Sequence, residues 1–392
     1  MKKLFLIVLS IFIFSCNDPV FYAISTEELP LKPRIAGPSS NFVELNKTMY
    51  VAAKRTLFAY KNDNDPETDN WVKKTTVGRI THLAATTNKL YALTEKENGK
   101  EKPIILYSND IEEEAHILIP DNDIISIYAS GDILFIGTLY SYKDEDNNKI
   151  EANGVWYLHE DDDSKTPIKT TVTGGVFSML CGVAGDNENY YLCNKDDNGI
   201  FKISKDAPYT ADAPWNAGFL TNSEDKEFTN IINLNTNSIA AMSRGGILFS
   251  VTPNGVEELV KFSDNRRATS ALCVFSDGTL ADGVWTKGEN RLLLVGRQDL
   301  TNSTTTGYTH GYVEIEFNAE TGVFGESFNE PGKTAFSSIS ENTNEHYASS
   351  IGKRGINYFY QAPDGTLFAS LNHGVWSYRK RIEGKFSWNA EE

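Results

Sequence analysis

The stretch Asp364-Gly-Thr-Leu-Phe-Ala-Ser-Leu-Asn-His-Gly-Val-Trp-Ser-Tyr378 decides how this chain of 392 residues folds. It contains two short runs of apolar and aromatic residues, 366–370 and 374–378, and a glycine-containing turn leads into each run. Glycine supplies the positive φ that tight turns require, so Gly365 and Gly374 each mark the start of a strand. The stretch therefore predicts two consecutive antiparallel strands of an all-β fold.

A strand like 366–370 recurs seven times along the chain. The middle residues of these strands are Tyr50, Tyr91, Phe135, Tyr191, Ala240, Leu293 and Phe368. A second strand follows each one, another β-like run precedes it, and most units end with a shorter fourth run. Four strands repeated with a period of about 50 residues are typical of a β-propeller blade. We therefore predict a seven-bladed β-propeller of four-stranded antiparallel blades over residues 42–392, with a β-sandwich plus a second β domain as the alternative.

The stretch 364–378 resembles the repeats of two-component-regulator-type propellers, in which an Asp-Gly turn leads into one strand and a glycine begins the next. The resemblance covers the last blade well and the other blades loosely. Asn153-Gly154 and Asn198-Gly199 precede strands in the same way, and we expect the Gly or the Asn of each pair to take a positive φ. The resemblance implies a propeller and no particular activity, because propellers serve both as binding platforms and as enzymes.

The N-terminus predicts export. Two lysines precede an apolar run, 4–14, which is too short to span a bilayer and is typical of a secretory signal. Cys16 directly follows Ile13-Phe14-Ser15, which resembles the lipobox of bacterial lipoproteins and implies lipidation of the cysteine sulfur. We predict a signal peptide at 1–15 and a tether rich in Pro and Ser at 16–41, with an ordinary signal peptide and an incidental cysteine as the alternative.

The chain is acidic, with 53 Asp and Glu residues, 37 Lys and Arg residues and a formal net charge of −16. Proteins bind nucleic acid by neutralising phosphates with basic side chains, so this composition disfavours a nucleic-acid partner. It also disfavours binding to anionic lipid headgroups. An acyl anchor rather than a basic patch would therefore hold the protein to a membrane of the cell envelope, on the periplasmic side or at the cell surface.

Three cysteines follow Cys16 in the sequence. Cys181 and Cys193 flank a turn, and they lie opposite each other if the two strands pair symmetrically about residue 187. Cross-strand neighbours are close enough for a disulfide, and an exported protein meets oxidising conditions. Two buried thiols are the alternative, and Cys273 is expected to be such a thiol.

The inner strands of a propeller line its central channel, where an enzyme would place catalytic groups. Ionisable residues on the expected inner strands are few, and Glu44 with His82 form the candidate general acid/base pair. A solvated Glu and a His bonded to a backbone carbonyl would explain the same two residues. No couple of facing carboxylates, Gly-x-Ser-x-Gly elbow or phosphate-binding loop can be assembled from the sequence. We therefore expect a protein that is not an enzyme, and we assign no catalytic residue.

The sequence predicts no metal centre and no cofactor, because its six histidines lack metal-ligand spacing and it has no Cys-x-x-Cys motif. Calcium is the one ion to consider. Side-chain oxygens alternate in two acidic segments, Asp63, Asp65, Glu67, Asp69 and Asp144, Asp146, Asn148, Glu151. Such alternation suits a hard cation, but neither segment has the glycine of an EF-hand, so solvated acidic loops are expected and calcium sites are the alternative.

Long connections are predicted between the second and third strands of a blade, at 95–103, 141–153 and 298–310, and between blades, at 216–228 and 325–350. Both kinds of connection open on the same face of a propeller. The candidate ligand-binding residues expected on this face are Tyr140, Tyr142, Tyr308, His310, Arg266 and Arg267. Aromatic side chains favour contact with a partner, and arginines can pair with a carboxylate or another anion. Tolerated insertions would also explain these connections.

Together these observations predict a lipid-anchored cell-envelope propeller that acts as a binding platform for a protein or glycan partner. A carbohydrate-active or other hydrolytic enzyme, with its site in the channel mouth, is the rival class. A purely structural subunit of an envelope complex is the third.

Overall fold

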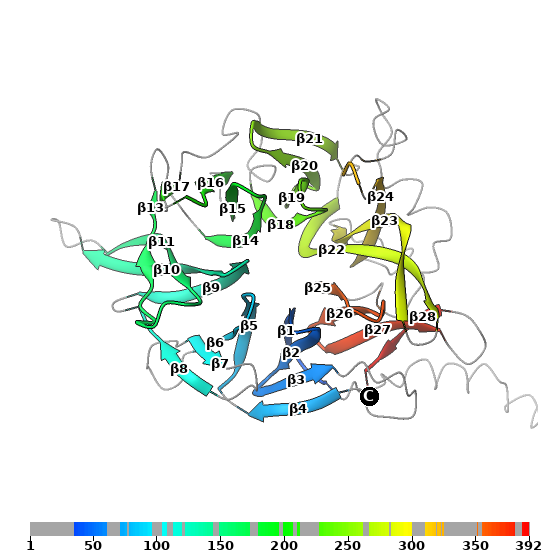
Figure 1. Cartoon of the computed structure of the whole chain (residues 1–392), viewed down its shortest axis with the longest axis horizontal. Helices are drawn as coiled ribbons and strands as arrows, with labels where there is room; N and C mark the ends of the chain where they lie inside the picture. The colour runs from blue at the N-terminus through cyan, green and yellow to red at the C-terminus, as the bar shows by residue number, and fades with distance from the viewer. Residues whose placement is uncertain are drawn as a thin grey trace, which may run out of the picture.

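The computed structural model shows seven small β-sheets arranged radially around a central axis (Figure 1). The residues that it describes are 35–60, 71–76, 78–95, 104–107, 113–119, 122–143, 149–172, 179–195, 199–206, 210–211, 227–261, 266–281, 284–299, 310–318, 320–322, 324, 351, 355–380 and 386–391. Within these ranges every regular element is a strand, and no helix long and apolar enough to cross a membrane is found there. The predicted seven-bladed β-propeller is confirmed.

The strands of the first three blades are β1 (Ser39–Leu45), β2 (Thr48–Ala53), β3 (Thr56–Tyr60), β4 (Trp71–Thr76), β5 (Ile80–Ala85), β6 (Leu90–Thr94), β7 (Ile104–Tyr107), β8 (Glu113–Ile117), β9 (Asp123–Ser130), β10 (Ile133–Lys143), β11 (Lys149–His159) and β12 (Ile168–Lys169). Those of blades 4 and 5 are β13 (Thr171–Val172), β14 (Leu180–Gly185), β15 (Asn189–Asn194), β16 (Ile200–Ser204), β17 (Thr210–Ala211), β18 (Phe228–Asn233), β19 (Ile239–Ser243), β20 (Ile247–Thr252) and β21 (Gly255–Lys261). Those of blades 6 and 7 are β22 (Arg266–Ala281), β23 (Val284–Asp299), β24 (His310–Asn318), β25 (Ile356–Gln361), β26 (Leu367–Leu371), β27 (Gly374–Lys380) and β28 (Phe386–Ala390).

Strand order within a blade follows the chain from the axis outward, as in β1-β2-β3-β4. Among the described residues, two blades depart from four antiparallel strands. Blade 4 has a fifth strand, because β13 pairs in parallel with β17. The sheet of blade 6 contains β22, β23 and β24, and its outer side has an isolated bridge between Phe317 and Phe324.

Every inner strand has an irregularity at a similar level of its ladder. In blade 2, Ile80 pairs with Thr94 and His82 pairs with Leu93, so Thr81 is an extra residue. Corresponding shifts occur in β1, β9, β14, β18, β22 and β25. An extra residue bends a strand and increases its twist.

Seven clusters of buried apolar side chains hold the ring together, one between each pair of neighbouring blades. Successive side chains of a strand point to opposite faces of its sheet, so one strand contributes to two clusters. Tyr91 packs between blades 2 and 3, whereas Ala92 packs between blades 1 and 2. This explains why β6 and β19 are buried along their whole length and show no polar alternation.

The turns follow from residues that tolerate positive φ. Asn46 and Lys47 connect β1 to β2 with φ values of 51° and 63°, as in a type I′ turn. Gly199, Gly365 and Gly374 also have positive φ, as predicted. Asn153 or Gly154 was expected to behave in the same way, but both lie within β11, where Gly154 pairs with Thr138, because β11 begins at Lys149.

The ring closes without exchanging a strand, because blade 7 consists of the consecutive strands β25 to β28. The chain before β1 instead docks on blade 7. Gly37 N donates a hydrogen bond to His373 O (3.1 Å), and Val375 N donates to Ile35 O (3.2 Å). Ile35 is fully buried between blades 7 and 1. The fold therefore includes residues 35–41, which the sequence assigns to the tether.

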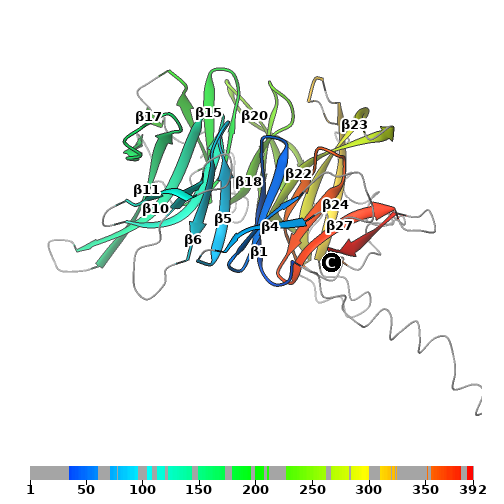
Figure 2. The same cartoon turned by 60° about the horizontal axis from the view of Figure 1, so that its bottom comes forward.

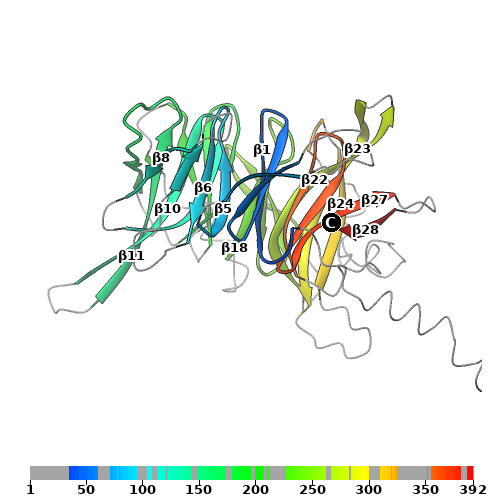
Figure 3. The same cartoon turned by 90° about the horizontal axis from the view of Figure 1, so that it is seen from below.

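Neighbouring inner strands run in the same direction along the axis (Figure 2). Near their starts, Thr269 Oγ1 of β22 donates to Ile356 O of β25 (3.1 Å), and near their ends Gln361 Nε2 donates to Ser276 O (2.8 Å). We call the face where the inner strands begin the lower face and the face where they end the upper face. They correspond to the bottom and top of Figure 3.

Candidate functional site

The hairpin of β10 and β11 extends beyond the ring at the lower face (Figure 3). Its pairing with the inner strand β9 reaches Leu139, which lies opposite Asp123. Beyond this point β10 and β11 remain paired with each other as far as Lys143 and Lys149. The segment 141–153 is therefore not the predicted loop, because most of its residues form a two-stranded ribbon.

The register of this ribbon brings together two predicted site residues. Tyr140 pairs with Ala152, and Tyr142 pairs with Ile150. Since successive residues of a strand alternate between its faces, these four positions share one face of the ribbon. The other face has the polar positions Ser141, Lys143, Lys149 and Glu151. The sequence thus makes the ribbon amphipathic.

The other candidate ligand-binding residues do not all lie in connections between strands. Arg266 and Arg267 belong to β22, where they pair with Asp299 and Gln298 of β23, so their assignment to a connection between blades is wrong. The inner strand of blade 6 begins earlier than its apolar pattern indicates. His310 is the first residue of β24. Tyr308 and the segment 325–350 lie outside the described residues.

The channel contains a histidine–tyrosine contact. The hydroxyl group of Tyr358 on β25 lies 3.2 Å from His82 Nε2 on β5, although blade 1 separates these two blades. Burial lowers the pKa of His82 to about 4 and raises the pKa of Tyr358 to about 12. Both side chains are therefore neutral near neutral pH.

Glu44 contacts a different tyrosine. The hydroxyl group of Tyr360 donates a hydrogen bond to Glu44 Oε2. Burial raises the pKa of Tyr360, and the bond to the Glu44 carboxylate raises it further. Glu44 and His82 thus bind two tyrosines that lie two positions apart on β25. No described contact joins Glu44 directly to His82, as the predicted acid/base pair would require.

Two buried polar atoms of the inner strands lack a hydrogen-bond partner among the described residues, His82 Nδ1 and Ser126 Oγ. These residues occupy equivalent positions beside the bulges of the neighbouring strands β5 and β9. Buried polar groups of this kind are usually satisfied by water or by a bound polar molecule. The inner strands β5 and β9 therefore present two polar atoms that the described residues leave unsatisfied.

Side-chain amides link neighbouring inner strands. Asn41 Nδ2 donates to Leu83 O (2.7 Å), and Leu83 N donates to Asn41 Oδ1 (2.8 Å). Asn233 bonds in the same reciprocal way to the backbone of Gly185, and Gln361 to that of Ser276. These amides satisfy backbone groups on the free edges of the inner strands. They therefore have a structural role.

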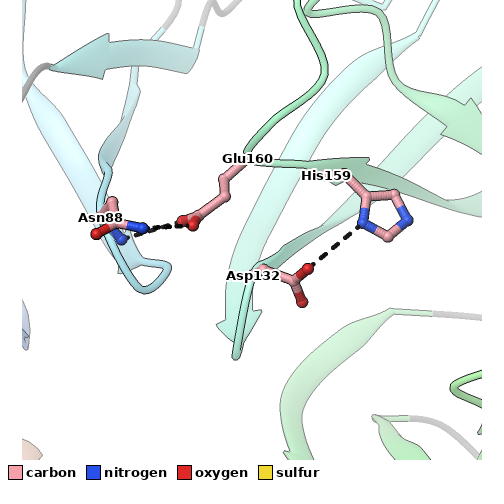
Figure 4. A network of polar contacts seen from close by, with 4 residues as sticks. All are labelled: Asn88, Asp132, His159 and Glu160. Carbon is pink, nitrogen blue, oxygen red and sulfur yellow. Dashed lines mark hydrogen bonds and ion pairs between the residues drawn. The ribbon is translucent and has the colours of Figure 1, made fainter.

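A second polar network joins the turns of blades 2 and 3 (Figure 4). Asn88 N and Nδ2 donate to Glu160 Oε2 (3.0 Å) and Oε1 (2.7 Å). Burial opposes ionisation of Glu160, but hydrogen bonds from Thr86 and Asn88 outweigh it and lower the pKa of the carboxyl group. Close by, His159 Nδ1 lies 3.8 Å from Asp132 Oδ2, and both side chains are exposed. The hydrogen bonds between Asn88 and Glu160 join blade 2 to blade 3.

The predicted calcium ligands are mostly outside the described residues. This holds for Asp63, Asp65, Glu67, Asp69, Asp144, Asp146 and Asn148. Glu151 lies in β11, opposite Ser141. Within the described ranges no group of three or more His, Cys, Asp or Glu side chains could hold a metal ion. The expectation of solvated acidic loops, with calcium sites as the alternative, therefore stays a prediction.

The three described cysteines, Cys181, Cys193 and Cys273, are free thiols and are buried. The predicted symmetric register is wrong by one residue. Leu180 pairs with Asn194 as expected, but Cys193 pairs with Gly182, so Cys181 is the extra residue of a bulge. Cys16 lies outside the described residues.

Sequence spacing alone does not point to Tyr358 and Tyr360, the partners of the two predicted channel residues. The available signal is the recurrence of Tyr at alternate positions of an inner strand, in Ile356–Gln361. Such spacing places both rings on the same side of the strand. An inner strand with two tyrosines on one side would have indicated an aromatic contact across the channel.

No protein-family model matches this chain, and no curated protein matches it. Among solved structures, it is similar to the extracellular domain of a B. thetaiotaomicron protein described as a hybrid two component system, with 12% identity, a TM-score of 0.51 and coverage of 89% of this chain and 39% of the other. A second structure of such a domain, described as part of a one component system, gives 12% identity, a TM-score of 0.53 and coverage of 88% and 39%. A protein from Bacteroides uniformis described as a 6-phosphogluconolactonase gives 11% identity, a TM-score of 0.48 and coverage of 91% and 95%. The chain spans about two fifths of the first two structures, and identities this low show a shared fold alone.

Proposed function

We propose that this protein is an exported propeller, attached to a membrane of the cell envelope through Cys16, that binds a protein or glycan partner with its lower face. The observation that carries the proposal is the ribbon of β10 and β11. It extends past the inner strand by four further paired positions, from Tyr140 opposite Ala152 to Lys143 opposite Lys149. A ribbon of two strands has little stability of its own, so its length favours a role outside the propeller core.

The composition of the ribbon supports contact with a partner. Tyr140, Tyr142, Ile150 and Ala152 share one face, and tyrosine is enriched at the centre of binding interfaces. The acidic sequence at 144–146 and the net charge of −16 disfavour a nucleic acid or an anionic lipid surface as that partner. A protein or a neutral glycan is the class that remains.

The channel gives less support to the rival hydrolase. Glu44 and His82 bind Tyr360 and Tyr358, and the low pKa of His82 keeps its imidazole neutral and weakly basic. A general acid/base pair requires two side chains that both reach the reacting atoms of one substrate. Their pKa values must also lie near the working pH. We therefore keep the binding role as the proposed function.

The proposal can be tested by shortening the ribbon. In the first variant, residues 140–152 are replaced by Asn-Gly, so that Leu139 and Asn153, already paired, are joined by a two-residue turn. In the matched control, residues 280–285 at the closed end of the β22–β23 hairpin on the upper face are replaced by Asn-Gly in the same way. Each full-length variant is used for pull-down from solubilised envelope and for binding to an array of neutral glycans.

The ribbon variant is expected to lose at least about tenfold in partner recovery, because hot-spot residues concentrate binding energy in a small patch. The control variant should bind like the parent, and both melting temperatures should stay close to that of the parent. Unchanged recovery by a folded ribbon variant would refute the lower-face proposal. Attachment is tested separately with Cys16→Ser, which should move the protein from the membrane fraction to the soluble fraction.

A further inference from the structure

Cys181 and Cys193 lie on the paired strands β14 and β15 of blade 4, at the position of a β-bulge. Leu180 pairs with Asn194 and Gly182 pairs with Cys193, which leaves Cys181 as the extra residue between them. At such a bulge, two residues of one strand oppose a single residue of its neighbour. Cys181 and Gly182 therefore share Cys193 as their opposite residue.

Both cysteine side chains lie on the same side of the blade. They belong to the apolar cluster between blades 4 and 5, where Cys193 is fully buried and Cys181 is 7% exposed. The Cys181 thiol donates weak hydrogen bonds to Cys193 O (3.3 Å) and to Phe228 O of blade 5 (3.4 Å). Burial, and then the neighbouring Cys181 thiol, raise the pKa of Cys193 well above its ordinary value. Cys193 is thus held as a protonated thiol in the reduced fold.

The geometry of the strands suits a cross-link. Cys181 is the bulge residue next to Gly182, which pairs with Cys193, and the Cys181 sulfur lies 3.3 Å from the Cys193 carbonyl oxygen, so the two residues are close neighbours across the strands, as a disulfide requires. Since the two side chains are also on one side of the sheet, a bond between them needs no change of strand pairing. Cys273 lies in a different cluster, between blades 6 and 7, and so provides a buried thiol for comparison.

We propose that Cys181 and Cys193 are joined by a disulfide in the exported protein. The two thiols lose two protons and two electrons as the sulfur–sulfur bond forms. The disulfide of an envelope thiol oxidant accepts the electrons and becomes two thiols. The inference rests on the export that is part of the proposed function.

The bond can be detected by differential alkylation. The full chain is isolated from the cell envelope, unfolded in guanidinium chloride without reductant and treated with iodoacetamide before peptide mass spectrometry. We expect Cys273 to be alkylated and Cys181 and Cys193 to be recovered as one linked pair, lighter by two hydrogen atoms. After dithiothreitol, all three should be alkylated. Alkylation of Cys181 and Cys193 without reductant would overturn the proposal.

A refolding experiment distinguishes whether the fold allows the disulfide from whether the protein is exported to an oxidising compartment. The purified, reduced chain is refolded with oxidised glutathione, which supplies the disulfide oxidant in the absence of any envelope. A linked pair after refolding, but free thiols in the chain isolated from cells, would refute the proposed export and the disulfide in the exported protein. Free thiols under both conditions would refute the disulfide itself, whereas the membrane attachment that belongs to the proposed function is judged by the Cys16→Ser experiment.

Thermal melting gives an independent measurement. Dithiothreitol should lower the melting temperature of the oxidised protein by roughly 3–6 °C, because a short cross-linked loop restricts the unfolded chain. It should not affect the double variant Cys181→Ser/Cys193→Ser. The matched variant Cys273→Ser should keep the sensitivity of the parent to reductant. A parent protein with the same melting temperature with and without reductant would contradict the proposal.

Discussion

Trp71 and Glu391, which are 320 residues apart, are joined by a hydrogen bond of 2.6 Å from the indole Nε1 to the carboxylate Oε2. The hydroxyl group of Ser377 donates to the other carboxylate oxygen, Oε1. All three side chains are buried, so water cannot replace these bonds. The contact joins the outer strand of blade 1 to blade 7 and closes the ring.

Removal of this carboxylate should weaken the closure. Glu391→Ala is expected to lower the free energy of unfolding by about 2–3 kcal/mol, because Trp71 Nε1 and Ser377 Oγ would be left buried without an acceptor. Glu391→Gln keeps one acceptor oxygen and should lose about half as much. Denaturant unfolding followed by tryptophan fluorescence measures both effects. Glu257→Ala, at an exposed position of β21, is the matched control, and equal losses in control and test variants would argue against the role of the contact.

Burial of His82 predicts a dependence of stability on pH. The pKa falls from an ordinary value of 6.5 to about 4 in the folded protein, so between these values the unfolded chain binds a proton that the folded chain does not. The contribution of neutral His82 to the free energy of unfolding is complete above pH 6.5. It is lost as the pH falls from 6.5 through about 4, and the total loss is about 3 kcal/mol.

Replacement of this imidazole should remove that dependence. In His82→Gln, the difference between the free energies of unfolding at pH 7 and pH 4.5 should be smaller than in the parent by about 2–3 kcal/mol. His373→Gln, which changes an exposed histidine in the turn before β27, should keep the dependence of the parent. A parent-like pH profile for His82→Gln would show that other groups cause the acid sensitivity.

The lowered pKa of Glu160 predicts a second acid-sensitive contact. Its carboxylate accepts two hydrogen bonds from Asn88, so it stabilises the fold above its ordinary pKa and loses this contribution as the pH falls through its lower folded value. Glu160→Gln should therefore lower the free energy of unfolding at pH 7 by about 1–2 kcal/mol and by less in acid. Asp161→Asn, at an exposed neighbour, is the control. A loss that is the same at every pH would contradict the electrostatic part of this argument.

The sequence was sufficient to predict the fold because each blade repeats the same local pattern. The apolar runs around Tyr50, Tyr91 and Phe368 are short, buried on both faces and separated by turn residues. This combination leaves few arrangements that bury all of them. The strand bounds were harder to predict. Polar residues, Arg266 and Arg267, extend β22 at its start, and Gly154 lies within β11 rather than in a turn before it.

The channel contacts could not be predicted because they join residues far apart in the sequence. Glu44 and His82 were identifiable as ionisable residues on inner strands, but their partners Tyr360 and Tyr358 come from the last blade. The bulge at Cys181 is similar in this respect, because one extra residue shifts the register without a distinct signal in composition. Local pattern predicts the blades, whereas contacts between blades depend on closure of the ring.

The amide of Asn41 provides a test of how the inner strands are held together. Its Nδ2 donates to Leu83 O at 2.7 Å, so Asn41→Asp would replace a donor by a carboxylate oxygen facing a carbonyl oxygen. The variant should lower the free energy of unfolding by about 1–3 kcal/mol at pH 7. Since a protonated carboxyl group can donate again, the pKa of the introduced acid should be raised and part of the loss should be recovered as the pH falls. Asn237→Asp, at an exposed position in the turn between β18 and β19, should change stability little at either pH, and the same loss in both variants would show that added charge rather than the lost donor is responsible.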